Sequence, residues 1–241
     1  MAGVAVQLYT IRDECERDFA GALARVGELG YDGVELFNLH GRDPVDVRAL
    51  LDGAGLAVVA MHAGLEALET ELPRLTDELA VLGSNRLVLS WIEPGDGAVE
   101  RITAVGAGVA EAGLDFGFHN HWLELAPQAD GSTFLDALRN LPADDLFLEL
   151  DLGWIWQAGA DPLEQLELTA GRCPLAHLKD YASREGRDDV PVGDGVVGYD
   201  RIVPAALAAG AEWLIVEEDE IGDRPYEALA RSLAATRRFA A

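Results

Sequence analysis

The sequence predicts one (β/α)8 barrel, the TIM-barrel architecture, over residues 1–241. Eight short apolar runs recur along the chain, and most segments between them have helical periodicity. A length of 241 residues also suits eight strand–helix units. Because no linker-like segment interrupts this pattern, we expect a single domain.

The apolar runs are short and often β-branched, as expected for parallel strands buried on both faces. They are VAVQLY (4–9), GVELF (33–37), LAVVAM (56–61), RLVLSW (86–91), LDFGFH (114–119), LFLELD (146–151), CPLAHL (173–178) and WLIVEE (213–218).

The segments between these runs show helix signals at both ends. Aspartate followed by proline at 43–44 and 161–162 is typical of a helix start. Glycine can adopt a left-handed conformation after a helix without steric cost. Such glycines stand before the next run at positions 30, 55, 83, 113, 171 and 210.

An open doubly wound sheet is the competing fold. A dinucleotide-binding sheet would carry its glycine motif after the first strand, but that strand leads into QLYTIRDE. A GxGxxG pattern occurs at 193–198, after a charged stretch, and Asp194 within it would face a pyrophosphate. We therefore interpret residues 193–198 as a turn-rich loop.

Charge and composition limit the kinds of molecule that this protein is expected to bind. The formal net charge of −25 disfavours nucleic acids and anionic membranes. No apolar stretch is long enough to span a bilayer, no secretory signal is visible, and Cys15 and Cys173 lack CxxC spacing. We expect a cytoplasmic protein with a small-molecule substrate, and we see no decisive stripe for a homo-oligomer.

Imidazole and carboxylate side chains gather at the ends of the predicted strands, where the active sites of such barrels lie. Four of the five histidines close or directly follow an apolar run. Several acidic residues also lie at or near the ends of apolar runs. The candidates for one site are His119, Asp151, His177 and Glu217, with His121 and Glu124 nearby.

Strand parity supports this grouping. His119 and His121 lie two residues apart, and so do His177 and Lys179, so each pair should share a face. A carboxylate such as Asp151 at the end of an apolar strand requires a cation or hydrogen-bond donors. The alternative is that Asp151 caps the following helix.

A mixed set of imidazoles and carboxylates favours Mn²⁺, Zn²⁺, Co²⁺ or Fe²⁺ over Ca²⁺, and Mg²⁺ is less favoured. We expect Glu35, His62, Trp91 and Trp154 to contact substrate. Lys179 is the only lysine beside 17 arginines, which suggests a role that a guanidinium cannot take.

The chain resembles the xylose isomerase-like TIM barrels, which include sugar phosphate isomerases/epimerases and the AP endonuclease family 2-like proteins. The resemblance covers nearly the whole sequence. Its strongest motifs are FHNHWLEL (118–125), ELDLGWIWQAGADP (149–162), GRCPLAHLKDY (171–181), VGDGVVGYDRI (192–202) and WLIVEEDE (213–220).

This resemblance implies metal ligation by Asp151, His177 and Glu217. Many relatives carry a glutamate near the position of His119, and this sequence departs from them. Either His119 is the fourth ligand, or Glu124 reaches the metal and the histidines act as base and substrate donors.

The activity that we expect is metal-dependent isomerisation or epimerisation of a small ketose or keto-sugar. Glu217 or Glu124 would remove a proton next to the carbonyl, His121 or His119 would donate hydrogen bonds, and Lys179 would stabilise the oxyanion. A dehydratase or β-eliminating lyase of an inosose or 3-keto-sugar is the alternative. A non-catalytic sugar-binding barrel is a third hypothesis.

Overall fold

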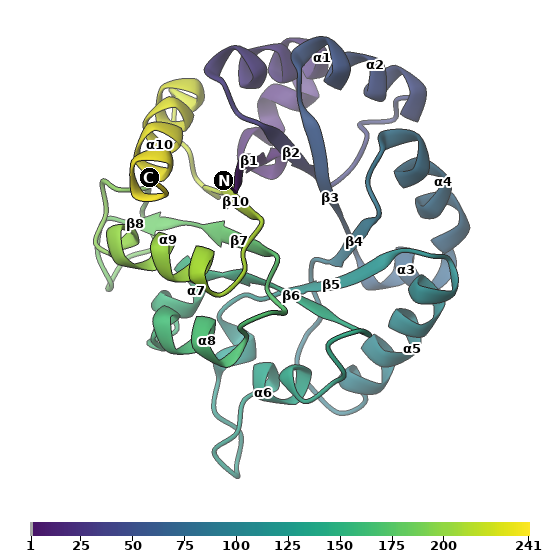
Figure 1. Cartoon of the computed structure of the whole chain (residues 1–241), viewed down its shortest axis with the longest axis vertical. Helices are drawn as coiled ribbons and strands as arrows, with labels where there is room; N and C mark the ends of the chain where they lie inside the picture. Colours follow the sequence, from purple (N-terminus) through teal and green to yellow (C-terminus); the bar gives the residue numbers. More distant parts are fainter. Residues whose placement is uncertain (1) are drawn as a thin grey trace.

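Eight parallel strands form a closed ring at the centre of the computed structural model, which describes residues 2–241 (Figure 1). The strands are β1 (Gly3–Gln7), β2 (Gly33–Leu36), β3 (Ala57–Ala63), β4 (Arg86–Leu89), β5 (Asp115–His119), β6 (Phe147–Asp151), β7 (Leu175–Leu178) and β10 (Trp213–Val216). The ring closes where β10 pairs with β1. The predicted barrel is confirmed, and each strand lies within about two residues of its predicted run.

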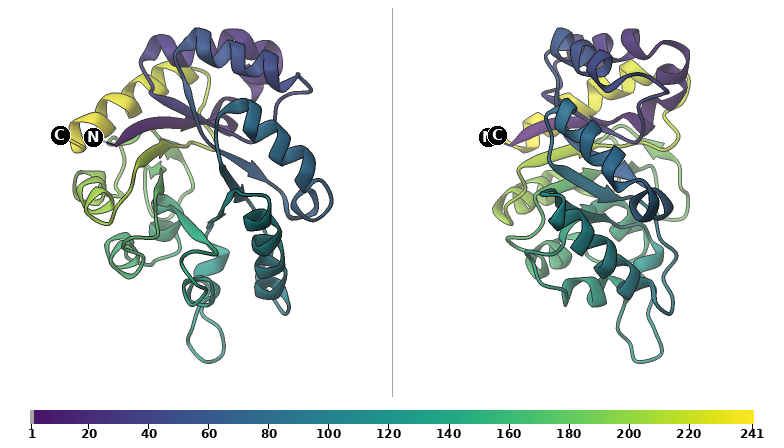
Figure 2. Two further views of the ribbon diagram at one scale, coloured as in Figure 1. Left: turned by 45° about the vertical axis from the view of Figure 1, so that its right-hand side comes forward. Right: turned by 90° about the vertical axis from the view of Figure 1, so that its right-hand side faces the viewer.

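Helices surround the ring and cover its outer face (Figures 1 and 2). They are α1 (Arg12–Leu29), α2 (Pro44–Ala54), α3 (Leu65–Thr70), α4 (Leu72–Leu82), α5 (Ala98–Glu111), α6 (Phe134–Arg139), α7 (Leu152–Gln157), α8 (Pro162–Leu168), α9 (Tyr199–Ala208) and α10 (Pro225–Phe239), with 3₁₀ turns η1 (Leu8–Ile11) and η2 (Leu123–Leu125).

The predicted helix ends are borne out. Asp43 and Asp161 accept hydrogen bonds from the first turns of α2 and α8. Gly30, Gly55 and Gly83 adopt left-handed conformations after α1, α2 and α4. Within residues 2–241, no helix has both the length and the apolarity needed to cross a membrane.

A small antiparallel sheet lies outside the barrel and was not predicted. It pairs β8 (Asp180–Tyr181) with β9 (Asp189–Val190). The glycine-rich loop packs beside it, where the Asp180 carboxylate accepts the amides of Gly193, Gly195 and Val197 at 2.9–3.2 Å. The loop is therefore a turn structure, as predicted. Its amides already donate hydrogen bonds to the Asp180 carboxylate and are not free to bind a phosphate.

The interior of the barrel is apolar in its middle and polar at the carboxyl ends of its strands. The small inner cluster consists of Ala5, Val59, Ala60, Val88, Leu175 and Ile215. Polar side chains are buried toward the carboxyl ends of several strands, among them Gln7, Glu35, His62, His119 and Asp151. This polarity places the candidate site at one end of the barrel.

Gly153 allows α7 to begin directly against β7. A Cβ atom at this position would overlap the backbone carbonyl oxygen of Lys179 and lie 2.7 Å from the Lys179 Cβ. Backbone cannot move aside as a flexible side chain can, so this contact requires glycine.

We predict that Gly153→Ala destabilises the protein by about 1–3 kcal/mol, the range typical of overpacking in a core. Gly53→Ala is the matched control, because Gly53 is exposed on α2 and a Cβ atom placed on it would meet nothing within 4 Å. That substitution should leave the free energy of unfolding unchanged or raise it by about 0.5–1 kcal/mol. Urea denaturation checks both; equal stability of the two variants would contradict the packing argument.

Candidate metal centre and cavity

The four side chains predicted as metal ligands come together at the carboxyl end of the barrel. His119 and Asp151 are the last residues of β5 and β6, and His177 lies in β7 directly opposite Asp151. Glu217 follows β10. One potential ligand atom from each of the four lies within 4.8 Å of the others. We call these residues (His119, Asp151, His177 and Glu217) the outer set.

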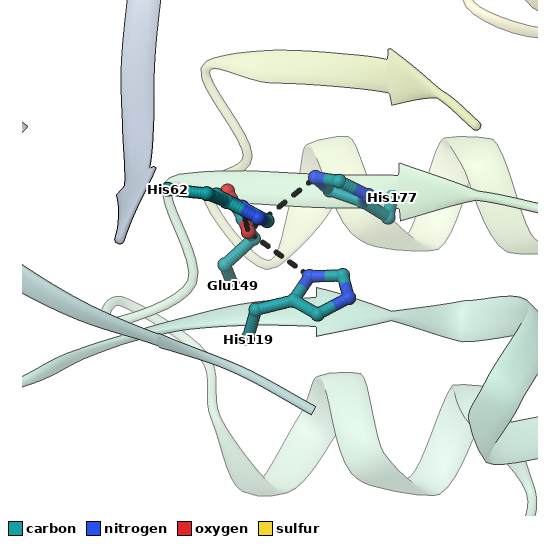
Figure 3. Close-up of side chains that lie close together, drawn as sticks. All are labelled: His62, His119, Glu149 and His177. Carbon is teal, nitrogen blue, oxygen red and sulfur yellow. Dashed lines mark hydrogen bonds and ion pairs between the residues drawn. The ribbon is translucent and has the colours of Figure 1, made fainter. Parts of the chain in front are cut away.

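A second group of donors lies beside the first and shares two of its members. It consists of His62, His119, Glu149 and His177, whose ligand atoms also lie within 4.8 Å of one another (Figure 3). We call it the inner set. Glu149 was not among the predicted site residues, although it stands two residues before Asp151 and strand parity gives both the same face.

Two buried carboxylates, Glu149 and Glu35, contact ring nitrogens of His119 and His177. His119 Nδ1 lies 3.0 Å from Glu149 Oε2, and His177 Nε2 lies 2.7 Å from Glu35 Oε2. Each ring thereby keeps its other nitrogen for a different partner. For His177 that nitrogen is Nδ1, which lies 3.0 Å from Glu217 Oε2.

His62 connects the two buried glutamates. Its Nε2 lies 2.7 Å from Glu149 Oε2 and 3.1 Å from Glu35 Oε2. Gln7 also donates to Glu35, at 2.9 Å. Within residues 2–241, Oε1 of each of these glutamates is buried without a hydrogen-bond partner.

Asp151 combines the two roles considered for it. Its Oδ1 accepts the Trp154 amide at 2.8 Å and caps α7. Its Oδ2 is buried and has no hydrogen-bond partner in the described chain. Asn120 fixes the position further, because its Oδ1 accepts the Asp151 amide at 3.0 Å. One oxygen of Asp151 therefore caps the helix, and the cap fixes the position of the other oxygen, which remains able to bind a ligand.

Lys179 places an ammonium group beside Asp151 and Glu217. It is 1% exposed, and its Nζ lies 3.4 Å from Glu217 Oε2, 3.5 Å from Asp151 Oδ2 and 3.0 Å from Asp219 Oδ2. Burial alone would raise the pKa of Glu217, but Lys179 and the His177 hydrogen bond lower it overall. Burial raises the pKa of Asp151 to about 7, although Lys179 opposes the shift.

The histidines differ in protonation because their surroundings differ. Burial and the neighbouring histidines hold the pKa of His119 well below its ordinary value, so its ring is neutral. Burial opposes protonation of His177 and His62 as well, but Glu35 and Glu149 outweigh it. The pKa of His177 is raised well above its usual value, and that of His62 to about 10.

This donor set fits a divalent cation. Three of the four outer residues are less than 4% exposed, and Glu217 is 6% exposed. Neutral imidazole and carboxylate are the groups that bind such ions, so His177 would release its proton when the ion binds. Asp151 Oδ2 accepts no hydrogen bond within residues 2–241 and faces the Lys179 ammonium at 3.5 Å, so this oxygen is available to a metal ion.

A cavity of about 510 Å³ opens above the site. Glu217, His62, His119 and His121 line it, together with the rings of Trp122 and Trp154. This volume falls within the range of small-molecule sites, about 300–1,000 Å³. The walls thus place apolar ring faces beside the candidate ligands.

Four residues predicted to act on substrate do not line this cavity: Lys179, described above, and Glu35, Glu124 and Trp91. Glu35 lies under it, with no exposed surface, in contact with His62 and His177. Glu124 is buried and accepts the His121 amide at 2.9 Å. Trp91 is 42% exposed, and its ring packs edge-on against His121, with centroids 4.6 Å apart.

Two arginines on the cavity wall were not predicted as site residues. Arg12 donates to the carbonyl oxygen of Asp219 at 2.9 Å. Arg187, between β8 and β9, lies 4.1 Å from the ring centroid of Trp122. Both positions depend on contacts between distant segments, which strand parity does not reveal.

Solved structures share the fold of this chain. A sugar phosphate isomerase/epimerase from Parabacteroides distasonis has a TM-score of 0.84 at 22% identity, covering 100% of this chain and 96% of its own. The IOLI protein with a bound zinc atom has a TM-score of 0.76 at 17% identity, covering 99% and 98%.

A probable 3-DHS dehydratase, AsbF, from Bacillus anthracis also has a TM-score of 0.76, at 16% identity, covering 98% of this chain and 97% of its own. No protein of curated function matches the sequence. The sequence profile of the xylose isomerase-like TIM barrel matches residues 23–238. The chain therefore belongs to the xylose isomerase-like TIM barrel family.

Proposed function

We propose that this protein is a divalent-metal-dependent isomerase or epimerase of a small ketose or keto-sugar. One observation carries the proposal: four metal-binding side chains from neighbouring strands converge, and two of them, His119 and Glu217, line a cavity large enough for a sugar. The likeness to a sugar phosphate isomerase/epimerase supports the same class of reaction.

We assign the cation to the outer set. A histidine that binds a metal generally donates its other N–H to a carboxylate, which fixes the ring and its tautomer. Glu149 and Glu35 hold His119 and His177 in this manner. Within the inner set, Glu149 bonds to two histidines, His62 at 2.7 Å and His119 at 3.0 Å, whereas the outer set has one such bond, between His177 and Glu217 at 3.0 Å.

The ligands would be His119, Asp151, His177 and Glu217, and the ion Mn²⁺, Zn²⁺, Co²⁺ or Fe²⁺. The zinc bound by the IOLI protein supports a transition metal of this type. When bound, the ion supplies Lewis acidity that stabilises negative charge developing on a carbonyl oxygen.

Glu217 is the proposed base, because its carboxylate lines the cavity beside His119 and His121. His121 lines the same cavity, and burial together with Lys179 lowers its pKa to about 3. A neutral His121 ring can donate one hydrogen bond to a substrate hydroxyl. Glu124 orients the backbone at His121 and is the alternative base.

Lys179 is proposed to stabilise the negative charge of the site. Its ammonium group contacts both Asp151 and Glu217 within 3.5 Å and therefore lowers the cost of burying them together. The same positive charge lowers the free energy of an oxyanion formed close to these ligands.

Trp154 and His62 are the proposed substrate contacts with direct support, since both line the cavity. Glu35 would act through His62 and His177, and Trp91 through the His121 ring. Trp122 adds a second ring face for the carbon side of a sugar.

A dehydratase or β-eliminating lyase is the second candidate. It would begin with the same proton abstraction, and the likeness to a probable 3-DHS dehydratase supports it. A product with a new double bond, rather than an epimer, would identify this activity. A non-catalytic sugar-binding barrel would have no use for a base beside a metal site.

We predict that Asp151→Asn weakens metal binding by more than about 100-fold, since losing a ligand costs more than losing a supporting carboxylate, about 10–100-fold. Asparagine retains the cap on Trp154, so the thermal stability of the metal-free protein should change little. Glu149→Gln is the matched comparison, with an expected loss of about 10–100-fold.

Metal titration of the purified variants measures these affinities. The assignment predicts a larger loss for Asp151→Asn than for Glu149→Gln. If Asp151→Asn binds metal normally and Glu149→Gln does not, the cation belongs to the inner set and the assignment is wrong.

We predict that Lys179→Arg lowers kcat/KM by at least about tenfold, equivalent to about 1.4 kcal/mol of transition-state stabilisation. A planar guanidinium cannot take the compact position of an ammonium among three carboxylates. Arg17→Lys, at an exposed position on α1, is the control for an exchange between the two basic side chains. Wild-type turnover by Lys179→Arg would leave the single lysine without a catalytic role.

The activity itself is tested by deuterium exchange. The protein is freed of metal, reconstituted with Mn²⁺ or Zn²⁺, and mixed with candidate ketoses in deuterated water. Metal-dependent exchange at one carbon next to the carbonyl is the expected result. A stoichiometrically metal-loaded protein that exchanges no ketose and forms no unsaturated product would contradict the proposed reaction.

A further inference from the structure

A second cavity, of about 630 Å³, lies beside the first. It extends over the segment after β2 toward α4, and its wall includes Phe37, His40 and Leu75. Both cavities are lined by Arg12, Phe37, His62, Ala63 and Gly64. A ligand bound over the candidate metal centre therefore has room to continue past His62 into the second space.

The charges around the second cavity balance. Three arginines and three acids line it: Arg12, Arg42, Arg74, Asp13, Glu16 and Glu78. His62 also lines it, but the buried Glu35 and Glu149 offset its charge. Arg74 is already paired with Glu78, at 2.6 Å. A wall of this kind gives no net attraction to an anion or a cation, so a neutral occupant is favoured.

The remaining wall combines an aromatic ring with polar groups. Phe37 is half-buried and packs edge-on against Tyr9 and His40, with centroids 5.4 Å away in both cases. In the part of the chain that the structure describes, Nε2 of His40 is buried without a partner. Asn38 adds an exposed amide. Ring faces with hydroxyl-binding groups suit a sugar.

We propose that the second cavity is a subsite for a second, uncharged sugar ring, so that the substrate is a two-ring saccharide rather than a single ketose. This inference rests on the proposed function for the identity of the ring over the metal centre. The first cavity holds the reacting ketose, and the second holds the ring attached to it.

Gly64 offers a way to close the passage. It lines both cavities, its φ of −74° is open to any residue, and nothing lies within 4 Å of a Cβ placed on it. A phenylalanine there would enter the shared space without backbone strain. Gly95→Phe is the matched control, because Gly95 is exposed, has equally open surroundings and lines neither cavity.

The test is calorimetric binding of fructose and of lactulose, turanose and palatinose, which join fructose to a second ring through different hydroxyls. Binding needs no turnover, so its result is separate from that of the exchange experiment. We expect at least one disaccharide to bind about tenfold more tightly than fructose, a difference of about 1.4 kcal/mol. Gly64→Phe should abolish this preference, and Gly95→Phe should retain it.

A second variant tests the subsite without changing Gly64, in case phenylalanine at that position distorts the backbone. Arg42→Ala changes an exposed side chain that lines the second cavity and not the first, and it should reduce the preference for the disaccharide. If no disaccharide binds more tightly than fructose, or if the preference survives in Gly64→Phe, the proposed subsite is wrong.

Discussion

Four carboxylates are buried together at one end of this barrel, and their mutual repulsion is the constraint on which the site depends. Glu35, Glu149, Asp151 and Glu217 are each less than 7% exposed. Burying such charges is unfavourable unless cations or donors compensate. Lys179, protonated histidines and shared protons supply part of that compensation. A divalent ion would supply the remainder, which connects the electrostatics of the fold to its chemistry.

The surrounding structure keeps these groups at fixed positions. Asn120 holds the backbone of Asp151, and Gln7 holds Glu35. Gly153 lets α7 begin against the backbone of Lys179, and Asp151 caps that helix. Because the supports come from strand ends and helix starts, they are rigid. Rigid supports are what a metal centre and a proton-transfer site require.

Much of this arrangement could be predicted from local sequence. Eight apolar runs and their glycine-terminated helices predicted the barrel, and parity placed His119, Asp151 and His177 at neighbouring strand ends. Glu149 was missed although the same parity rule applies to it. Glu35 was expected to touch substrate, but the sequence could not show that His62 and His177 would cover it. The β8–β9 sheet and Arg187 depend on long-range packing of a charged segment.

Anomalous X-ray diffraction from a crystal of the protein loaded with Mn²⁺ tests the metal centre most directly. We expect one strong manganese peak within bonding distance of His119, Asp151, His177 and Glu217. A manganese peak bound by His62 and Glu149 instead would contradict this assignment. So would a crystal with no manganese at either position, if the same protein still exchanges ketose protons.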